Sequence, residues 1–185
     1  NNFYNLANLI LKKLLNTLRS NHSLYKNNKL EFLNNMKISD INDITYEKED
    51  NGICTITLNK PKRKNAMSFV TFLEIESVLE DMEADKNARV LIITGAKEAN
   101  AFSSGGYFNM NMYTSVPPEI MEELDLQDIA VKRLCMKFWE FSKPVIAAVN
   151  GLAVGAGFTM LLSGADLIYM SEDAYIGFYF IRRAV

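Results

Sequence analysis

The chain has 185 residues, a net charge of −2, and 49% hydrophobic against 23% charged residues. This length favours one domain, the composition is that of a globular rather than a disordered protein, and the near-neutral charge gives no support to a nucleic-acid partner. No uninterrupted apolar run is long enough to span a bilayer, so no membrane partner is expected. One histidine excludes a multi-histidine metal centre within the chain, and two cysteines are too few for a disulfide framework, so no metal is expected either.

The first 37 residues differ in composition from the rest. Residues 1–37 carry six basic side chains against one acid, Glu31, and are rich in asparagine. We predict that this leader lies outside the fold, and that residues 38–185 form the folded domain. The leader is either an acid-poor organellar targeting peptide or sequence upstream of a natural start at Met36. If translation starts at Met36, we expect the protein to be cytoplasmic. The single histidine, His22, lies in the leader and is a poor candidate for a catalytic base.

Strands and helices alternate along the remainder. Residues 53–58 alternate between two faces and predict a strand. Ser68 is placed to cap a helix that runs to about Asp85, with apolar side chains on one side and acids such as Glu74 largely elsewhere. Three short apolar runs predict further strands, at 90–94, 145–149 and 166–170. Two further helices are predicted, at 119–141 and 156–163. The alternation predicts an α/β fold with right-handed crossovers.

Two glycine-rich turns follow predicted buried strands, and they are the candidate sites for chemistry. The first is Ser103-Ser104-Gly105-Gly106-Tyr107, and the second runs from Gly151 to Gly157. Small residues let a ligand or another backbone approach closely, and a turn that opens a helix presents free N–H groups at the positive end of the helix dipole. Two such turns facing one another would hold an anionic oxygen without any charged side chain. Taken singly, such a turn is more often ordinary loop geometry than a site.

The second turn has a rival interpretation as a nucleotide loop. Its Gly-x-x-x-Gly-x-Gly pattern also fits the NAD-binding loop of short-chain dehydrogenases. Those enzymes carry the loop at their first strand and a Tyr-x-x-x-Lys pair well after it. The one such pair in this chain, Tyr25 and Lys29, precedes the turn, and 28 residues follow Gly157. A dehydrogenase-like NAD binder is therefore a remote alternative.

Four segments in order resemble the crotonase (enoyl-CoA hydratase/isomerase) superfamily: 56–68, 90–95, 101–110 and 143–177. The resemblance implies an α/β spiral core of repeated ββα units. It also implies an acyl-CoA thioester substrate with no separate cofactor, because coenzyme A is part of the substrate. Family members form homotrimers or hexamers, largely through a C-terminal helical region. The chain resembles a member that stops before that region, and we expect such a fragment to be inactive by itself.

The resemblance also assigns site residues. Two backbone N–H groups that hold the thioester oxygen and stabilise an enolate fall on Gly106 and Ala156. The stretch from Ser104 through Gly105 and Tyr107 to Phe108 is implied to line the CoA and thioester channel. Lys64 and Ala66 are implied substrate-binding residues, and Lys62, Arg63 and Lys64 resemble the family's basic loop near the CoA phosphates. A solvated turn is an equally good interpretation of that basic loop.

The chain departs from the family pattern at the positions of the acids. Hydratases of the family use two glutamates, which map to Thr159 and near Phe180, and Tyr107 stands where the family commonly has Asp. Neither Thr nor Phe can transfer a proton as Glu does, so a double-bond isomerase with one acid beyond Val185 is favoured over a hydratase. A non-catalytic acyl-CoA-binding or scaffold member is the alternative. The nearby acids Asp166, Glu172 and Asp173 are expected to be structural or solvated.

Overall fold

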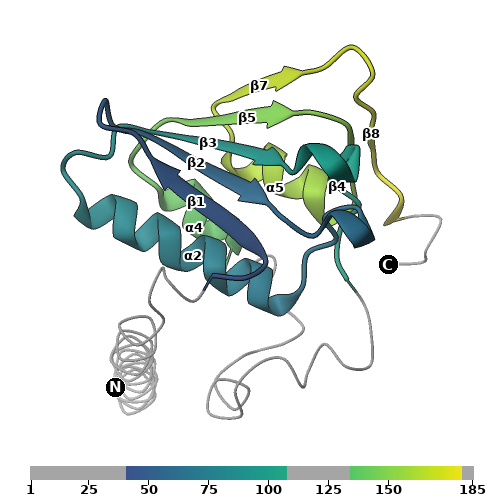
Figure 1. Cartoon of the computed structure of the whole chain (residues 1–185), viewed down its shortest axis with the longest axis horizontal. Coiled ribbons are helices and arrows are strands. Elements are labelled where there is room, and N and C mark those ends of the chain that lie inside the picture. The colour runs from purple at the N-terminus through teal and green to yellow at the C-terminus, as the bar shows by residue number, and fades with distance from the viewer. Residues whose placement is uncertain (1–40, 108–133, 181–185) are drawn as a thin grey trace, which may run out of the picture. The chain divides into compact units, whose positions relative to one another are not determined.

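The computed structural model describes residues 41–107 and 134–180, which form two sheets and the helices beside them (Figure 1). The predicted leader, residues 1–37, lies outside the described residues, and so does Phe108. In the described part, no helix is long and apolar enough to cross a membrane.

The larger sheet has five strands in the order β1-β2-β3-β5-β7, with β1 antiparallel to β2 and the other neighbours parallel. Their bounds are β1 Ile44–Lys48, β2 Ile53–Leu58, β3 Val90–Gly95, β5 Val145–Val149 and β7 Leu167–Met170. Four of the five were predicted, β2 from its alternation and β3, β5 and β7 from their apolar runs. Strand β1 was not predicted, because only one of its five residues is buried and its sequence, ITYEK, carries two charges.

The smaller sheet has three parallel strands in the order β4-β6-β8. They are β4 Ala101–Ser103, β6 Leu152–Val154 and β8 Ile176–Gly177. Each follows closely after a strand of the larger sheet: β4 after β3, β6 after β5, and β8 after β7. Each repeat of the chain therefore adds one strand to each sheet, which is the predicted spiral of ββα units. The small strands escaped prediction because two or three residues are too few to show a periodicity.

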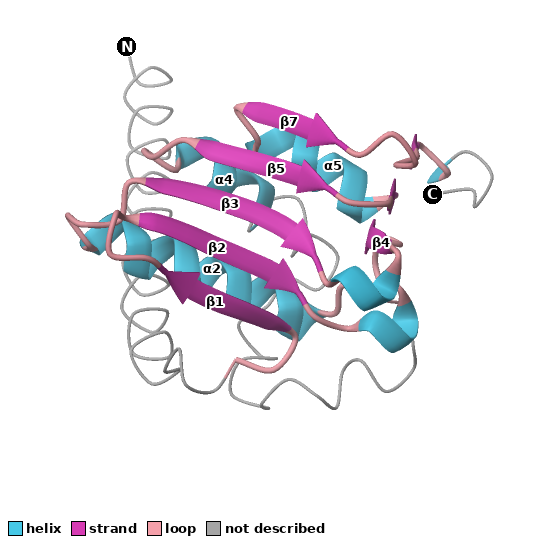
Figure 2. Cartoon of the chain, turned by 45° about the horizontal axis from the view of Figure 1, so that its top comes forward, coloured by secondary structure: helices cyan, strands magenta, loops and turns pink. Residues whose placement is uncertain are grey.

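Three helices cover one face of the larger sheet (Figures 1 and 2). They are α2 Phe69–Ala84, α4 Met136–Glu140 and α5 Ala156–Gly164. Two short 3₁₀ turns precede β4 in the chain, η2 Pro61–Arg63 and η3 Lys97–Ala99. The helices predicted at 69–85 and 156–163 are confirmed as α2 and α5. Of the helix predicted at 119–141, the part before residue 134 lies outside the described residues.

Helix α2 begins as predicted, with a capping box in which the Ser68 hydroxyl accepts from the Thr71 N–H and the Thr71 hydroxyl accepts from the Ser68 N–H. The prediction for its acids was wrong at Glu74 and Glu76, each of which is 1% exposed. The Glu74 carboxylate accepts the N–H groups of Asn42, Asp43 and Ile44 at 2.8–3.1 Å, so it anchors the chain that enters β1. Burial raises the pKa of Glu74, and the backbone hydrogen bonds oppose that rise.

The core lies between the larger sheet and these helices. Alternate residues of β2, β3 and β5 are buried, and the apolar side of α2, including Ile75, Leu79 and Met82, is fully buried. Strand β7 differs, because all four of its residues are exposed. The larger sheet therefore ends in an open apolar edge.

Candidate functional site

The two glycine turns are brought together by the smaller sheet. The first turn begins at the last residue of β4, the second turn contains β6 and ends just after it, and these two strands are parallel neighbours. Parallel neighbours deliver their following residues to the same edge of a sheet. The backbones are in contact there: a Cβ placed on Gly105 would lie 3.0 Å from the Val154 carbonyl oxygen and 3.4 Å from the Ala156 nitrogen. Gly105 also has φ +97°, so the position requires glycine for both reasons.

The direction of the Gly106 N–H follows from a bridge to Met67. The Met67 N–H donates to the Gly105 carbonyl oxygen at 2.8 Å, and the Tyr107 N–H donates to the Met67 carbonyl at 2.7 Å. The Gly105 carbonyl and the Gly106 N–H belong to one trans peptide unit and point in opposite directions. The Gly106 N–H is therefore directed away from Met67, and in the described part of the chain it has no acceptor.

Ala156 is the first residue of α5, and its N–H is one of the groups that a helix leaves without an internal partner. The capping residue, Gly155, has φ +54° and no side chain to accept the N–H groups of the first turn. Across residues 41–107 and 134–180, no acceptor faces the Ala156 N–H. The contact of the turns and the two unused donors are what an anion-binding site needs.

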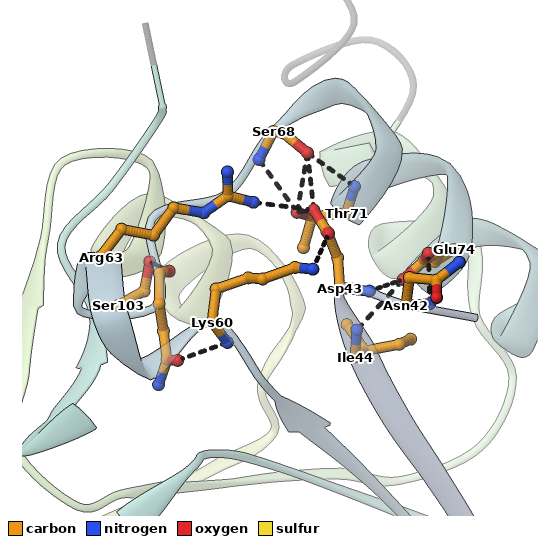
Figure 3. Close-up of polar contacts among 10 residues, drawn as sticks. Asn42, Asp43, Ile44, Lys60, Arg63, Ser68, Thr71, Glu74 and Ser103 are labelled. Carbon is orange, nitrogen blue, oxygen red and sulfur yellow. Dashed lines mark hydrogen bonds and ion pairs between the residues drawn. The ribbon is translucent and has the colours of Figure 1, made fainter. Parts of the chain in front are cut away.

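The basic loop is built on a buried carboxylate that the sequence reasoning missed (Figure 3). Asp43, 7% exposed, pairs with Lys60 at 2.8 Å and Arg63 at 3.0 Å, and accepts from the Ser68 and Thr71 hydroxyls at 2.7 and 2.6 Å. Burial would raise the pKa of Asp43, but the hydrogen bonds from Lys60, Ser68 and Thr71 outweigh it and hold the pKa below its usual value. Asp43 therefore stays ionised and fixes the loop.

Arg63 faces inward, and this changes the interpretation of the basic loop. Its guanidinium pairs with Asp43 and lies over the Tyr107 ring, with Cζ 4.4 Å from the ring centroid. Lys62 and Lys64 are exposed instead. Residues 59–63 line a hollow of about 310 Å³. Because Lys60 and Arg63 are paired with Asp43, the exposed Lys62 and Lys64 are the cations of this loop that can meet a bound anion.

The backbone of the same loop supports the first glycine turn. The Ser104 N–H donates to the Lys64 carbonyl at 2.9 Å, and the Ser104 hydroxyl donates to the Arg63 carbonyl at 3.2 Å. Ala66, predicted to bind substrate, is 8% exposed. Asn65, 1% exposed, accepts from the Lys60 N–H and donates to the Ala101 carbonyl, each at 2.9 Å. Sequence reasoning passed over Asn65, although its left-handed φ of +53° is one that Asn adopts more readily than most residues.

The positions expected to carry acids in a hydratase hold no carboxylate. The Thr159 hydroxyl donates to the Ala156 carbonyl of its own helix at 3.2 Å, and Phe180 is half-buried. Asp166 is structural, as expected, since its carboxylate accepts the Val145 N–H at 2.7 Å. Glu172 and Asp173 are exposed in a turn, also as expected.

The segment after β8 reaches the same edge as the two turns. Strand β8 is the parallel neighbour of β6, and the Gly155 N–H donates to the Gly177 carbonyl at 3.4 Å. The Phe178 ring lies 4.6 Å from that of Phe158, two residues beyond Ala156 in α5. Three successive repeats of the spiral therefore send their loops to one place.

Comparison with known proteins agrees with this architecture. The enoyl-CoA hydratase/isomerase family model matches residues 48–183. The chain is 34% identical over 142 residues to a hydroxycinnamoyl-CoA hydratase-lyase of Pseudomonas fluorescens, covering 72% of this chain and 47% of that protein. It is 33% identical over 125 residues to enoyl-CoA delta isomerase 2 of Rattus norvegicus, covering 68% of this chain and 30% of that protein. The crystal structure of an enoyl-CoA hydratase/isomerase from Xanthobacter autotrophicus matches with a TM-score of 0.64 at 31% identity, over 76% of this chain and 50% of the other.

The chain belongs to the enoyl-CoA hydratase/isomerase family, and the resemblance found in the sequence is confirmed. It spans about half the length, or less, of the curated relatives it matches. The dehydrogenase interpretation loses its basis, because residues 152–154 inside the second turn form β6, a strand of the smaller sheet, and the segment is not an open loop after the first strand of a nucleotide-binding sheet. The relatives include both hydratases and isomerases, so family membership leaves the choice of reaction open.

Proposed function

We propose that this chain forms the acyl-CoA-binding part of an enzyme that stabilises a thioester enolate between the Gly106 and Ala156 N–H groups. The observation that carries the proposal is the contact of the two glycine turns, each with a backbone donor that has no acceptor in the described residues. Such donors are fixed before the reaction begins, so they stabilise developing negative charge without reorganising. Lys62 and Lys64 are exposed beside the first turn and would meet the phosphates of coenzyme A.

The proposed reaction is movement of a double bond and not addition of water. A hydratase needs one group to activate water and another to protonate carbon, and neither Thr159 nor Phe180 can do either. An isomerase needs one carboxylate, which takes the proton from C2 of a 3-enoyl thioester and returns it to C4 of the dienolate. Strand β8 is the parallel neighbour of β6, so the residues that directly follow it lead to the same edge as the glycine turns, which supports a carboxylate supplied from beyond Val185.

The absence of a carboxylate at Thr159 and Phe180 also favours a second candidate function, a non-catalytic member that binds acyl-CoA. Both candidates predict binding through the glycine turns, and only the first predicts turnover. We expect the full-length protein to be a homotrimer or hexamer, as the family resemblance implies.

The test compares ligands and then substrates. Calorimetry should show acetoacetyl-CoA binding more tightly than coenzyme A, and no binding of NAD. The full-length protein should then convert a 3-enoyl-CoA to the conjugated 2-enoyl-CoA and should not hydrate the 2-enoyl-CoA. Binding without conversion would support the non-catalytic candidate, hydration would refute the isomerase proposal, and equal affinity for acetoacetyl-CoA and coenzyme A would refute the enolate site itself.

A further inference from the structure

Ser103, the last residue of β4, connects the two glycine turns and the basic loop. Its side chain is fully buried. The hydroxyl donates to the Asn65 carbonyl at 2.8 Å and accepts the Gly105 N–H at 3.1 Å. Asn65 is itself held at both ends of its side chain, by the Lys60 N–H and the Ala101 carbonyl. The serine hydroxyl thus joins the first turn to a rigid part of the loop.

The same side chain packs against the second turn. A Cβ placed on Gly157 would lie 2.7 Å from the Ser103 Cβ and 3.0 Å from its hydroxyl oxygen. Gly157 directly follows Ala156 at the start of α5, and the absence of a side chain there lets Ser103 approach the helix backbone. Ser103 therefore lies between the segments that carry the two proposed donors.

The hydrogen bond to Gly105 has a specific consequence for the neighbouring amide. The Gly105 N–H is taken by Ser103 and the Gly105 carbonyl is taken by Met67, so both peptide units that flank Gly105 are fixed. The second of these units contains the Gly106 N–H, whose direction is then determined. Without the hydroxyl, Gly105, which at φ +97° has the freedom of glycine, could rotate the first unit.

We infer that Ser103 is a positioning residue, which holds the peptide unit before Gly105 so that, with the Met67 bridge, the Gly106 N–H keeps its direction and its spacing from the Ala156 N–H. This inference rests on the proposed function, because it matters only if these two groups bind the thioester oxygen. It assigns no contact with substrate to Ser103. Its effect should therefore appear in stabilisation of the enolate and not in affinity for coenzyme A.

The experiment uses acetoacetyl-CoA, whose bound enolate has its own ultraviolet absorbance, with coenzyme A as the reference ligand. In Ser103→Ala the enolate fraction should fall by about tenfold to a hundredfold, as expected for a donor displaced by a fraction of an ångström to one ångström. Affinity for coenzyme A should stay within about twofold, because Lys62 and Lys64 are untouched. Ser103→Cys keeps nearly the same volume against Gly157 with a poorer hydrogen-bonding group, and should show an intermediate loss even if the alanine variant folds poorly.

Two control variants separate positioning from general stability. Ser163→Ala removes a hydroxyl that donates to the Met160 carbonyl at 3.2 Å, at the far end of α5. Ile56→Val trims a fully buried residue of β2 and lowers the melting temperature without touching either turn. Both should keep the enolate fraction of the unmodified protein.

The outcomes distinguish the two levels of the argument. If the unmodified protein shows no enolate signal, the proposed function fails and the positioning role falls with it. If it does, but Ser103→Ala and Ser103→Cys keep the full signal, or lose it only in parallel with affinity for coenzyme A and with melting temperature, the positioning role alone is refuted.

Discussion

Replacing Ala156 with proline offers a direct test of a backbone donor, because it deletes an N–H group at a position where the fold tolerates the change. Ala156 is the first residue of α5, the helix position that proline favours, and Gly155 before it has no Cβ to meet the proline ring. No hydrogen bond of the described residues uses the Ala156 N–H, so the substitution breaks none of them. We therefore expect the melting temperature to change by a few degrees at most.

The effect on catalysis should be much larger than the effect on stability. Loss of one donor of an oxyanion hole lowers kcat by about a hundredfold to a thousandfold, or about 3–4 kcal/mol of barrier. The assay, on the full-length protein, is the kcat and KM for conversion of a 3-enoyl-CoA to the 2-enoyl-CoA. Since the donor acts mainly on the transition state, kcat should carry most of the loss.

The matched control is Ala156→Gly, which removes a methyl group and keeps the N–H. It should retain kcat within a few-fold, with a modest loss of stability from glycine in the first turn of a helix. The reasoning would be refuted if proline and glycine gave the same kcat, or if the proline variant kept full activity while remaining folded.

Thr159→Ala should leave the isomerase kcat within about twofold, because the Thr159 hydroxyl donates to the Ala156 carbonyl of its own helix; a large loss in the same assay would show that the hydroxyl acts on substrate. Asp43→Asn should lower the free energy of unfolding by about 3 kcal/mol in urea titrations near neutral pH, since it leaves partly buried cations without their anion. The lowered pKa of Asp43 means that its stabilisation is complete above the unfolded value of about 3.9 and is lost as the pH falls through the folded pKa. The variant should therefore lose less stability on acidification than the unmodified chain does, and equal losses would contradict the assignment. Strand β7, whose four residues are 40–65% exposed, should drive concentration-dependent association that Ile168→Lys reduces in light scattering; a monodisperse monomer at all concentrations would be contrary to this expectation.

The larger sheet could be predicted from the sequence because its inner strands bury alternate or continuous apolar residues. The runs at 53–58, 90–94 and 145–149 all became strands with the expected bounds, to within a residue. The smaller sheet could not be predicted from periodicity, since its strands have two or three residues and are defined by their partners. It entered the prediction only through the family resemblance, which supplied the ββα repeat.

The candidate site divides in the same way. The two glycine turns were visible because closely spaced glycines follow two predicted apolar strands, and their contact in the structure fits that interpretation. The residues that hold them were not visible, because their partners are distant in the chain. Ser103 and Asn65 are separated by 38 residues, and Asp43 and Ser68 by 25, so no local pattern marks either pair. A buried Asp or Asn looks in sequence like any turn residue.

The spiral explains how one scaffold can host both hydratases and isomerases, and on what ground we propose an isomerase for this chain. Each of the first two repeats contributes one backbone donor, the first after β4 and the second after β6. Backbone donors persist when a side chain changes, as at Tyr107, which replaces the residue usual in the family. Acids are a separate contribution: Thr159 belongs to the second repeat, and the loop that begins at Phe178 belongs to the third. A hydratase places a carboxylate on both repeats. In the proposed isomerase the second repeat has lost its acid, and the third alone, held against α5 through Phe158, supplies the proton shuttle next to the donors.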